Sequence, residues 1–463
     1  MDGSYGRLDP DLAAAVAVTR FGLGAKRGEL MAARHDPQAW LRAQIRPAAG
    51  ADQPETPTPD AAKRLVEFRD YQQRKRAAEM AHQDFDPVKE VGRMIRQDAG
   101  ADFLARAQLA ATTDAGFRER WALFWCNHFT VSASKAQVAT LVGPYEDEAI
   151  RPHVFGRFED MLVASSSHPA MLLYLDQAQS VGPDTMAASF LSRGGKRAGL
   201  NENLAREIME LHTVGVEAGY SQADVTEFAR AMTGWSIGGL KEPDAGKFRF
   251  RPAAHEPGSR TIMGKPYPQD GMQQALAVMK DLAASPHTAH HVALKLARHF
   301  VADDPPPSLV AKLQRSFQAT GGDLAELAHT LVLAPEAWSP QAQKFKTPYE
   351  FLVSSYRAAG ATPAALPQLA ILNTLGQKPF SAPSPKGWPE DATTWCAPDA
   401  VIKRMAWSQA LAAQSLNGRD PVQMAQDALG ARLTAPVAAA IQRAETREEG
   451  LAILLMSPEF QRR

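Results

Sequence analysis

Apolar residues recur at helical spacing along most of this chain. Val292, Leu296 and Phe300 follow one another every four residues, the spacing that places side chains on one face of an α-helix. The helix that they predict opens at Ser285-Pro286, a good pair for an N-cap and a first helical position. Because this pattern dominates, we expect an all-α protein, a large multi-helix globular domain with long loops.

Strand-like alternation is rare in the sequence. Its clearest instance lies between Lys247 and Thr261, where Phe248 and Phe250 alternate with basic residues. We expect a small β-hairpin there at most.

Proline- and glycine-rich stretches predict where the chain divides. Residues 47–59 separate a short N-terminal helical segment, residues 1–46, from a main helical domain, residues 60–463. Further candidate boundaries inside the main domain lie near residues 180–200, 235–268 and 378–398. Loops of this length in a compact protein are usually functional or disordered.

Charge is balanced over the chain, which changes the list of expected partners. Lys plus Arg and Asp plus Glu both total 51, whereas nucleic-acid binding requires clustered cations. The basic run Arg74-Lys75-Arg76 lies within the charge-rich stretch from Glu67 to Gln97, which predicts a pair of exposed helices. We therefore expect no nucleic-acid partner.

The cysteine count and the lack of targeting patterns limit the kinds of site and the cellular location that we expect. Two cysteines, Cys126 and Cys396, exclude a disulfide framework and an all-thiolate zinc site. The first residues show no signal-peptide pattern, and apolar runs such as Leu12 to Val18 are shorter than the roughly 20 residues that span a bilayer. We expect no membrane span and a cytoplasmic protein, unless a partner carries it elsewhere.

The most familiar catalytic signatures are absent from the sequence. It has no phosphate-binding loop of the Walker type, no HExxH zinc motif and no GxSxG nucleophile elbow. These absences count against the commonest nucleotide-dependent and serine-hydrolase chemistries.

One dense segment, Trp121 to Ser132, is apolar nearly all round and predicts a buried helix. Asn127 and His128 are polar groups in that setting and need partners. Either His128 is a hydrogen-bonded core histidine, or it serves as a ligand or general base, since imidazole suits both tasks.

A second dense segment, Asn201 to Thr213, predicts a helix whose buried stripe is Leu204, Ile208 and Leu211. On one flank of that stripe a straight helix carries Asn203, Glu207 and Glu210, and on the other flank His212. Two carboxylates one turn apart can bind a hard divalent cation. The alternative is an ion-paired helix in which Arg206 neutralises Glu202 or Glu210.

Several other residues are candidates that only the fold could bring together. Trp235 follows a helix that Ser221 and Asp224 are expected to cap, and is a possible pocket wall. His287 and His291 have the spacing that can hold zinc, although they fall in the first turns of a helix, where polar side chains are common. Scattered candidates are His153, Asp176 and His255.

Taken together, these segments resemble a large bacterial family catalogued as domain of unknown function number 1800. The similarity covers nearly the whole chain and is carried by Ala14 to Leu30, Trp125 to Ser132, Ile150 to Asp176, Asn201 to Thr213, Tyr220 to Trp235, His287 to Ala289, Lys295 to Val301, Thr320 to Asp323 and Lys386 to Trp388. Two positions depart from the family pattern: Leu204 stands where a tyrosine is frequent, and Gln177 where asparagine is usual.

The resemblance implies one helical unit and supplies no reaction. It also implies a partner, because members look paired with a sulfatase-like protein that bears a twin-arginine export signal. Two functions follow as expectations. The chain is a metal-dependent enzyme or metal-handling protein with a Glu/His polar site, or it is a non-catalytic helical subunit, exported in complex with such a partner.

The sharpest expectation is that the two dense segments face each other, bringing His128 near Glu207 and Glu210. Catalytic candidates are His128, His153, Glu207 and Glu210. Candidate cofactor-binding residues are Asn127, Asp176, Asn203 and Trp235. Candidate ligands of a divalent metal are His128, Glu207, Glu210 and His212.

Overall fold

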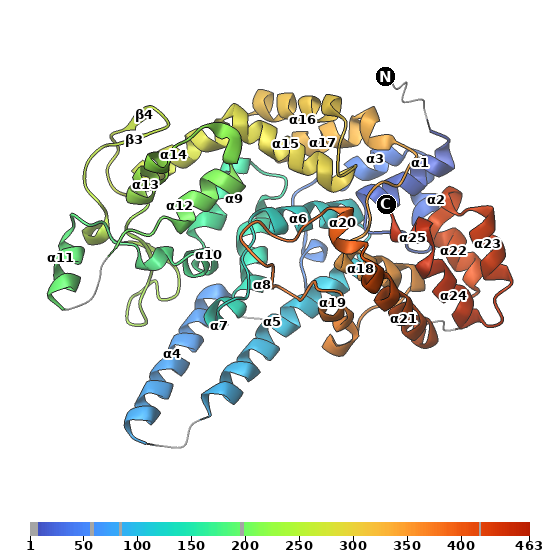
Figure 1. Cartoon of the computed structure of the whole chain (residues 1–463), viewed down its shortest axis with the longest axis horizontal. Coiled ribbons are helices and arrows are strands. Elements are labelled where there is room, and N and C mark those ends of the chain that lie inside the picture. Colours follow the sequence, from blue (N-terminus) through green and yellow to red (C-terminus); the bar gives the residue numbers. More distant parts are fainter. Residues whose placement is uncertain (1–7, 56–59, 83–85, 195–198, 416–417) are drawn as a thin grey trace.

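The structure is a computed structural model, and it describes residues 8–55, 60–82, 86–194, 199–415 and 418–463. In that part of the chain 65% of residues are helical, in 25 α-helices. Strand is limited to two small antiparallel pairs. The all-α prediction is therefore confirmed (Figure 1). No helix within the described ranges has the length and apolarity needed to cross a membrane.

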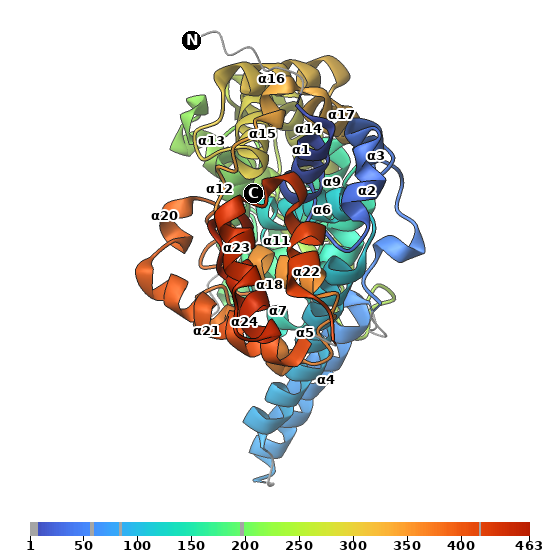
Figure 2. The ribbon, with the colours of Figure 1, turned by 90° about the vertical axis from the view of Figure 1, so that its right-hand side faces the viewer.

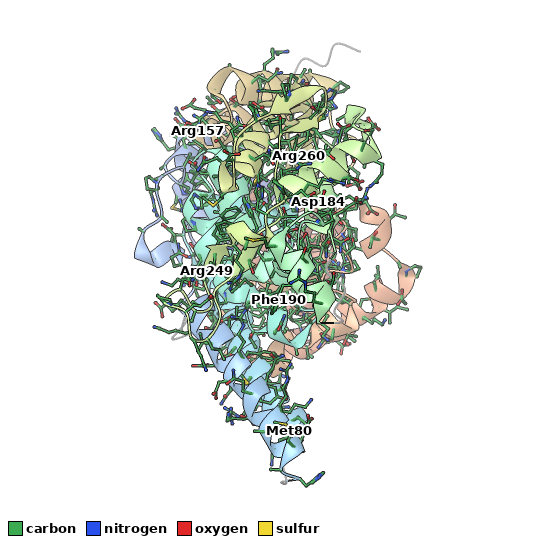
Figure 3. All side chains as sticks on the ribbon, turned by 90° about the vertical axis from the view of Figure 1, so that its left-hand side faces the viewer. Met80, Arg157, Asp184, Phe190, Arg249 and Arg260 are labelled. Carbon is green, nitrogen blue, oxygen red and sulfur yellow. The ribbon has the colours of Figure 1, made fainter. Side chains whose placement is uncertain are left out.

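The described residues up to Thr112 make a small helical group and a projecting hairpin. The bounds are α1 (Pro10–Val16), α2 (Glu29–Arg34), α3 (Pro37–Arg42), α4 (Ala61–Met80) and α5 (Pro87–Thr112). Helices α4 and α5 extend away from the body of the molecule (Figures 1 and 2), and Met80 marks the end of this arm (Figure 3). They are the exposed helix pair that the charge-rich stretch predicts.

The middle of the chain forms the body. Its helices are α6 (Gly116–His128), α7 (Ala136–Ala139), α8 (Val142–Tyr145), α9 (Phe158–Ser167), α10 (Pro169–Tyr174), α11 (Met186–Arg193), α12 (Asn203–Glu207), α13 (Gln222–Ala231), α14 (Met272–Ala284), α15 (Pro286–Phe300), α16 (Pro307–Thr320) and α17 (Leu324–Leu333). Ser285 caps α15 as expected, and Ser221 and Asp224 form the expected capping box of α13.

The last quarter of the chain covers one side of the body. Its helices are α18 (Pro348–Ala359), α19 (Ile371–Thr374), α20 (Ala392–Trp395), α21 (Pro398–Ser415), α22 (Pro421–Leu429), α23 (Ala435–Gln442), α24 (Arg447–Met456) and α25 (Pro458–Gln461). One hydrophobic core extends from Val16 to Phe460 and includes Leu41 of the N-terminal segment. At its centre, Phe117 and Trp121 of α6 each lie 5.9 Å from Phe300 of α15.

The strands differ in pairing from the expected hairpin. Strand β2 (Phe248–Phe250) pairs with β1 (Trp235–Ile237), and β3 (Arg260–Ile262) pairs with β4 (Lys265–Tyr267). The stretch from 247 to 261 thus supplies one strand to each of two sheets. Trp235 of β1 is fully buried, and its ring centroid lies 5.2 Å from that of Phe248 in β2. This contact packs β2 against β1.

The helix expected between Asn201 and Thr213 changes its winding partway. After α12 the chain continues as a π-helix, η6 (Ile208–His212). A π-helix has more residues per turn than an α-helix, so the buried face rotates. Leu204 and Ile208 are buried as predicted, but Leu211 is partly exposed and His212 is buried instead.

Candidate functional site

A stripe of basic residues follows one face of α15. His291, Lys295 and His299 recur every four residues, so their side chains project on the same side of the helix. That side lies against α6, because the rings of His291 and His128 are 6.2 Å apart and those of His299 and Phe124 are 5.3 Å apart. The two helices run antiparallel and enclose the stripe.

Two imidazoles bind the end of the π-helix η6. The Nε2 atom of His128 lies 3.0 Å from the carbonyl oxygen of His212, and Nε2 of His291 lies 3.0 Å from that of Leu211. A carbonyl only accepts, so both ring nitrogens carry the proton and donate. The carbonyls at a helix end lack partners within the helix, and these two histidines supply them.

The same tautomer leaves unmatched polar atoms inside the protein. In a neutral ring that donates through Nε2, the other nitrogen carries a lone pair. Nδ1 of His128 is buried and has no hydrogen-bond partner among the described residues, and the same holds for both ring nitrogens of the fully buried His212. Buried polar atoms are normally satisfied, so a group of exceptions calls for an explanation.

Burial keeps these imidazoles neutral. It lowers the pKa of His212 to about 3 and that of His291 to about 4, and the positive charge of Lys295 adds to both effects. The pKa of His128 falls well below its ordinary value for the same two reasons.

Lys295 is the exceptional member of the stripe. It makes no hydrogen bond and no ion pair with any residue in the described ranges, and its side chain is only partly exposed. Burial lowers the pKa of its ammonium group to about 8, although the carboxylate of Glu390 acts in the opposite direction. A lysine perturbed in this way is a candidate functional residue.

His299 at the end of the stripe is held by a carboxylate. Its Nδ1 donates to Oε1 of Glu390 over 2.7 Å, while its Nε2 is buried without a hydrogen-bond partner. Burial lowers the pKa of His299, although Glu390 opposes this shift. The neutral ring therefore presents a lone pair at Nε2.

His299 is one of the residues that line a partly open pocket of about 110 Å³. Its polar lining includes Arg120, Asn127, His299, Glu350, Glu390 and Arg463. Glu350 is flanked by two guanidinium groups, with Arg463 at 2.8 Å and Arg120 in contact. Burial alone would raise the pKa of Glu350, but Arg463 and Arg120 hold it well below its ordinary range.

The segment that carries Glu390 is fixed from several sides. Trp388 donates its backbone N–H to Oδ1 of Asn127 (2.7 Å) and accepts from Nδ2 of the same amide (3.0 Å). Lys344 donates to the carbonyl oxygen of Glu390 over 2.6 Å. The ring of Trp395, next to the exposed Cys396, donates to the carbonyl oxygen of Pro389 and lies 6.2 Å from the ring of Trp388. Asn127, a predicted cofactor-binding residue, thus uses its side-chain amide to bind the backbone of Trp388.

His128 contacts the predicted helix from Asn201 to Thr213 through a hydrogen bond to the carbonyl oxygen of His212. His128 makes no hydrogen bond or ion pair with Glu207 or Glu210. Arg206 lies 3.6 Å from Glu210 and 3.0 Å from Glu202, which are the ion pairs that the alternative reading proposed. Glu207 forms no ion pair with any residue that the structure describes, and burial together with Glu210 raises its pKa.

The remaining candidates lie apart from the stripe. Asp176 forms an ion pair with Lys135 (2.7 Å), and Asn203 is exposed at the start of α12. His153 is partly exposed, and burial lowers its pKa. The buried Trp235 packs in β1.

No group of three or more His, Cys, Asp or Glu residues among those described could hold a metal ion. His287 is exposed, while His291 uses Nε2 on the carbonyl of Leu211, so this pair does not form a zinc clamp through that atom. A metal at Glu207 and Glu210 remains a prediction.

Sequence reasoning missed Lys295, His299 and Glu390 as site residues. The first two carried a usable signal, because they interrupt an apolar helix at intervals of four from His291. Glu390 carried none, since its position depends on the folding of a proline-rich segment far along the chain.

Comparison with known proteins identifies a family and nothing more. A family model described as "Protein of unknown function (DUF1800)" matches residues 16–462, nearly the whole chain. No curated protein and no solved structure shows a significant match.

Proposed function

The chain belongs to the DUF1800 family, and we propose that it is an enzyme in which the Glu390–His299 pair acts as a general base on a small polar substrate bound in the pocket that His299 lines. The observation that carries this proposal is His299, which lines the pocket with Nδ1 bound to Glu390 and with Nε2 buried and without a hydrogen-bond partner among the described residues. A Glu/His polar site was expected from the sequence, but at other residues.

The chemistry follows from the tautomer. A carboxylate that accepts from Nδ1 fixes the ring, leaves the lone pair on Nε2 and stabilises the imidazolium formed when Nε2 takes a proton. Glu390 is suited to this because, although burial raises its pKa, the hydrogen bond from His299 and the positive charges of Lys344 and Lys295 lower it overall. Arg120 and Arg463 lie beside the pocket and would orient an anionic or strongly polar substrate.

The size of the pocket restricts the substrate. The pocket, which is partly open to solvent, has a volume of about 110 Å³, room for several water molecules. The substrate, or the part of it that enters, is therefore compact.

The test is turnover of a panel of small polar esters, amides and hydroxy acids. We expect a substrate that the unaltered protein converts, with the rate reduced at least about 100-fold in His299→Gln, the scale of general-base catalysis. Glu390→Gln should also slow it. His290→Gln is the matched control, since His290 lies on the same helix but faces solvent and contacts only Gln314. Equal rates in His299→Gln and His290→Gln would overturn the proposal.

A divalent metal at Glu207 and Glu210 is the other enzymatic proposal. It is supported by the half-buried Glu207 carboxylate, which lacks a hydrogen-bond or ion-pair partner. Metal analysis of protein purified without tags or chelators tests it: a stoichiometric metal should be lost in Glu207→Gln while the fold persists. Absence of metal from the unaltered protein would contradict it.

A role as the subunit of a complex is a second candidate function. Met186 and Phe190 lie one turn apart on α11 and are 79% and 77% exposed, and Phe190 stands at the surface (Figure 3). Exposed apolar pairs of this kind favour a protein contact. The proposed partner is the sulfatase-like protein, whose signal would also export the chain. Co-expression should give a complex that Met186→Ser with Phe190→Ser weakens, whereas Met31→Ser, equally exposed elsewhere, does not.

A further inference from the structure

We propose that the pocket lined by His299 binds a small carboxylate, whose charged group is bound by Arg120 and attracted into the pocket by Lys378. This inference rests on the proposed function, because it names the class of substrate for the same site. It is carried by the contacts of three residues that line the pocket, namely Arg120 of α6, Gln377 and Lys378.

The guanidinium group of Arg120 has one nitrogen without a hydrogen bond. Its Nε donates to the carbonyl oxygen of Gly22 over 2.5 Å, and its Nη1 donates to Oε1 of Glu350. Nη2 forms no hydrogen bond with any residue in the described ranges, yet it is not completely buried. Because only 2% of Arg120 is exposed and the residue lines the pocket, this exposed nitrogen is available to a ligand there.

The wall around Arg120 holds more positive charge than its carboxylate neutralises. Glu350 is shared by two guanidinium groups, since Arg463 lies 2.8 Å away and Arg120 is in contact with it. Elsewhere in the lining the pairing is one to one, with Arg106 bound to Glu146 over 2.7 Å. Buried charges are normally paired, so a ligand with a single negative charge would complete the set around Glu350.

The edge of the pocket adds a cation and an amide donor. Lys378 is exposed and forms no ion pair with any residue that the structure describes. Its neighbour Gln377 accepts at Oε1 from the backbone N–H of Tyr349 over 2.7 Å, which leaves its Nε2 group as a donor. That N–H lies in the first turn of α18, and the N-terminal end of a helix carries partial positive charge. These groups favour an anion over a neutral or cationic ligand.

The rest of the lining selects a carboxylate among anions. The pocket has a volume of about 110 Å³, and Phe103, Leu123 and Phe380 contribute apolar walls. A phosphate group carries up to about two negative charges and three acceptor oxygens, which one free guanidinium nitrogen and one amide cannot match. A short carboxylic acid needs fewer donors, and its hydrocarbon part can pack against the apolar walls.

Binding of acetate and acetamide tests the inference, because the two molecules share a shape and differ in charge. Titrations of the intact protein at low ionic strength, followed by NMR of the ligand signals, give both dissociation constants. We expect acetate to bind at least about ten times more tightly, the scale of one hydrogen bond to a charged group. Acetate binding no tighter than acetamide, or inorganic phosphate binding tighter than acetate, overturns the inference.

Variants locate the bound carboxylate. Arg120→Lys keeps a positive charge beside Glu350 but lacks Nη2, so it should weaken acetate binding at least about tenfold and leave acetamide unchanged. Lys378→Met should weaken acetate binding at low ionic strength, and added salt should reduce the difference, because salt screens an exposed charge. Lys280→Met is the control, since Lys280 is an exposed lysine of α14 that does not line the pocket.

Circular dichroism shows whether each variant folds. If Arg120→Lys does not fold, Lys378→Met decides, and acetate affinity equal to that of Lys280→Met at low ionic strength overturns the inference. His299→Gln should leave acetate binding intact even where turnover is lost. Acetate binding of the expected strength without turnover of any carboxylate would therefore support this inference and remove the general-base role alone.

Discussion

Two cations of this protein have opposite surroundings. At the base of the α4–α5 arm, Arg64 is fully buried and binds both oxygens of Asp102, at 2.6 and 2.8 Å, as well as the carbonyl of Thr140 at 2.7 Å. On α15, the partly exposed Lys295 makes no hydrogen bond or ion pair with any described residue. A buried charge that is fully paired holds the architecture together, whereas a cation without a partner contributes no such support.

The largest expected effect separates the two cations directly. Arg64→Met leaves the Asp102 carboxylate buried without its partner and should lower the free energy of unfolding by about 3–5 kcal/mol. Lys295→Met removes an unpaired ammonium group and should leave the free energy of unfolding unchanged or raise it. Urea unfolding followed by circular dichroism measures both. Equal losses in the two variants would abolish the distinction.

A second effect tests how firmly residues 386–391, the segment that carries Glu390, are held in place. Gly387 has a φ of +86°, and a β-carbon there would lie 2.5 Å from the carbonyl oxygen of Asn127. Gly387→Ala should therefore cost about 1–3 kcal/mol in backbone strain and release the segment. Gly92→Ala is the control, because Gly92 lies in α5 with nothing within 4 Å and should gain up to about 1 kcal/mol. Hydrogen exchange of residues 386–391 should rise in the first variant alone.

A third effect lies in the pH dependence of stability. An imidazole whose pKa is lower in the folded protein than in the unfolded chain binds fewer protons when folded, so its contribution is present above pH 6.5 and is lost as the pH falls. For His212 the loss continues from 6.5 toward about 3. His212→Gln should therefore flatten the stability profile between pH 6.5 and 4.5 by up to about 1.4 kcal/mol per pH unit. An unchanged slope in this variant would contradict the buried, neutral state of His212.

The smallest effect concerns the exposed part of the arm. Arg74 pairs with Glu90 at 2.8 Å and Asp70 at 3.0 Å, with 52% of its side chain exposed. Arg74→Ala should cost less than about 1 kcal/mol, because solvent screens such pairs, and that cost should shrink further in high salt. A loss as large as that of Arg64→Met would show that pairing alone, without burial, carries the stability.

The sequence predicts more of the fold than of the candidate site. Helical periodicity and the Ser285 and Ser221 caps are local signals, so they were sufficient to predict α15 and α13. The burial of His128 also followed from its apolar neighbours. The partner of His128 did not, because the π-helical turn at Ile208–His212 rotates His212 inward. No periodicity argument that assumes 3.6 residues per turn anticipates this rotation.

The pairing of His299 with Glu390 could not be predicted from the sequence for a different reason. These residues are 91 positions apart, and Glu390 is placed by a chain of contacts from Asn127 and Lys344 that the linear sequence does not reveal. Long-range polar contacts of this kind depend on packing that is settled only when the whole core has formed.

The unequal exposure of the two cysteines allows a dye to be attached selectively to Cys396. The thiol of Cys126 is buried, and burial raises its pKa well above the usual range, whereas Cys396 is exposed beside Trp395. A maleimide dye would therefore attach at one position without any engineering. Indole rings quench many fluorophores on contact, and Trp395 and Trp388 lie 6.2 Å apart at the segment that carries Glu390. Emission from a dye on Cys396 would therefore report any change in the position of that segment when candidate ligands are added.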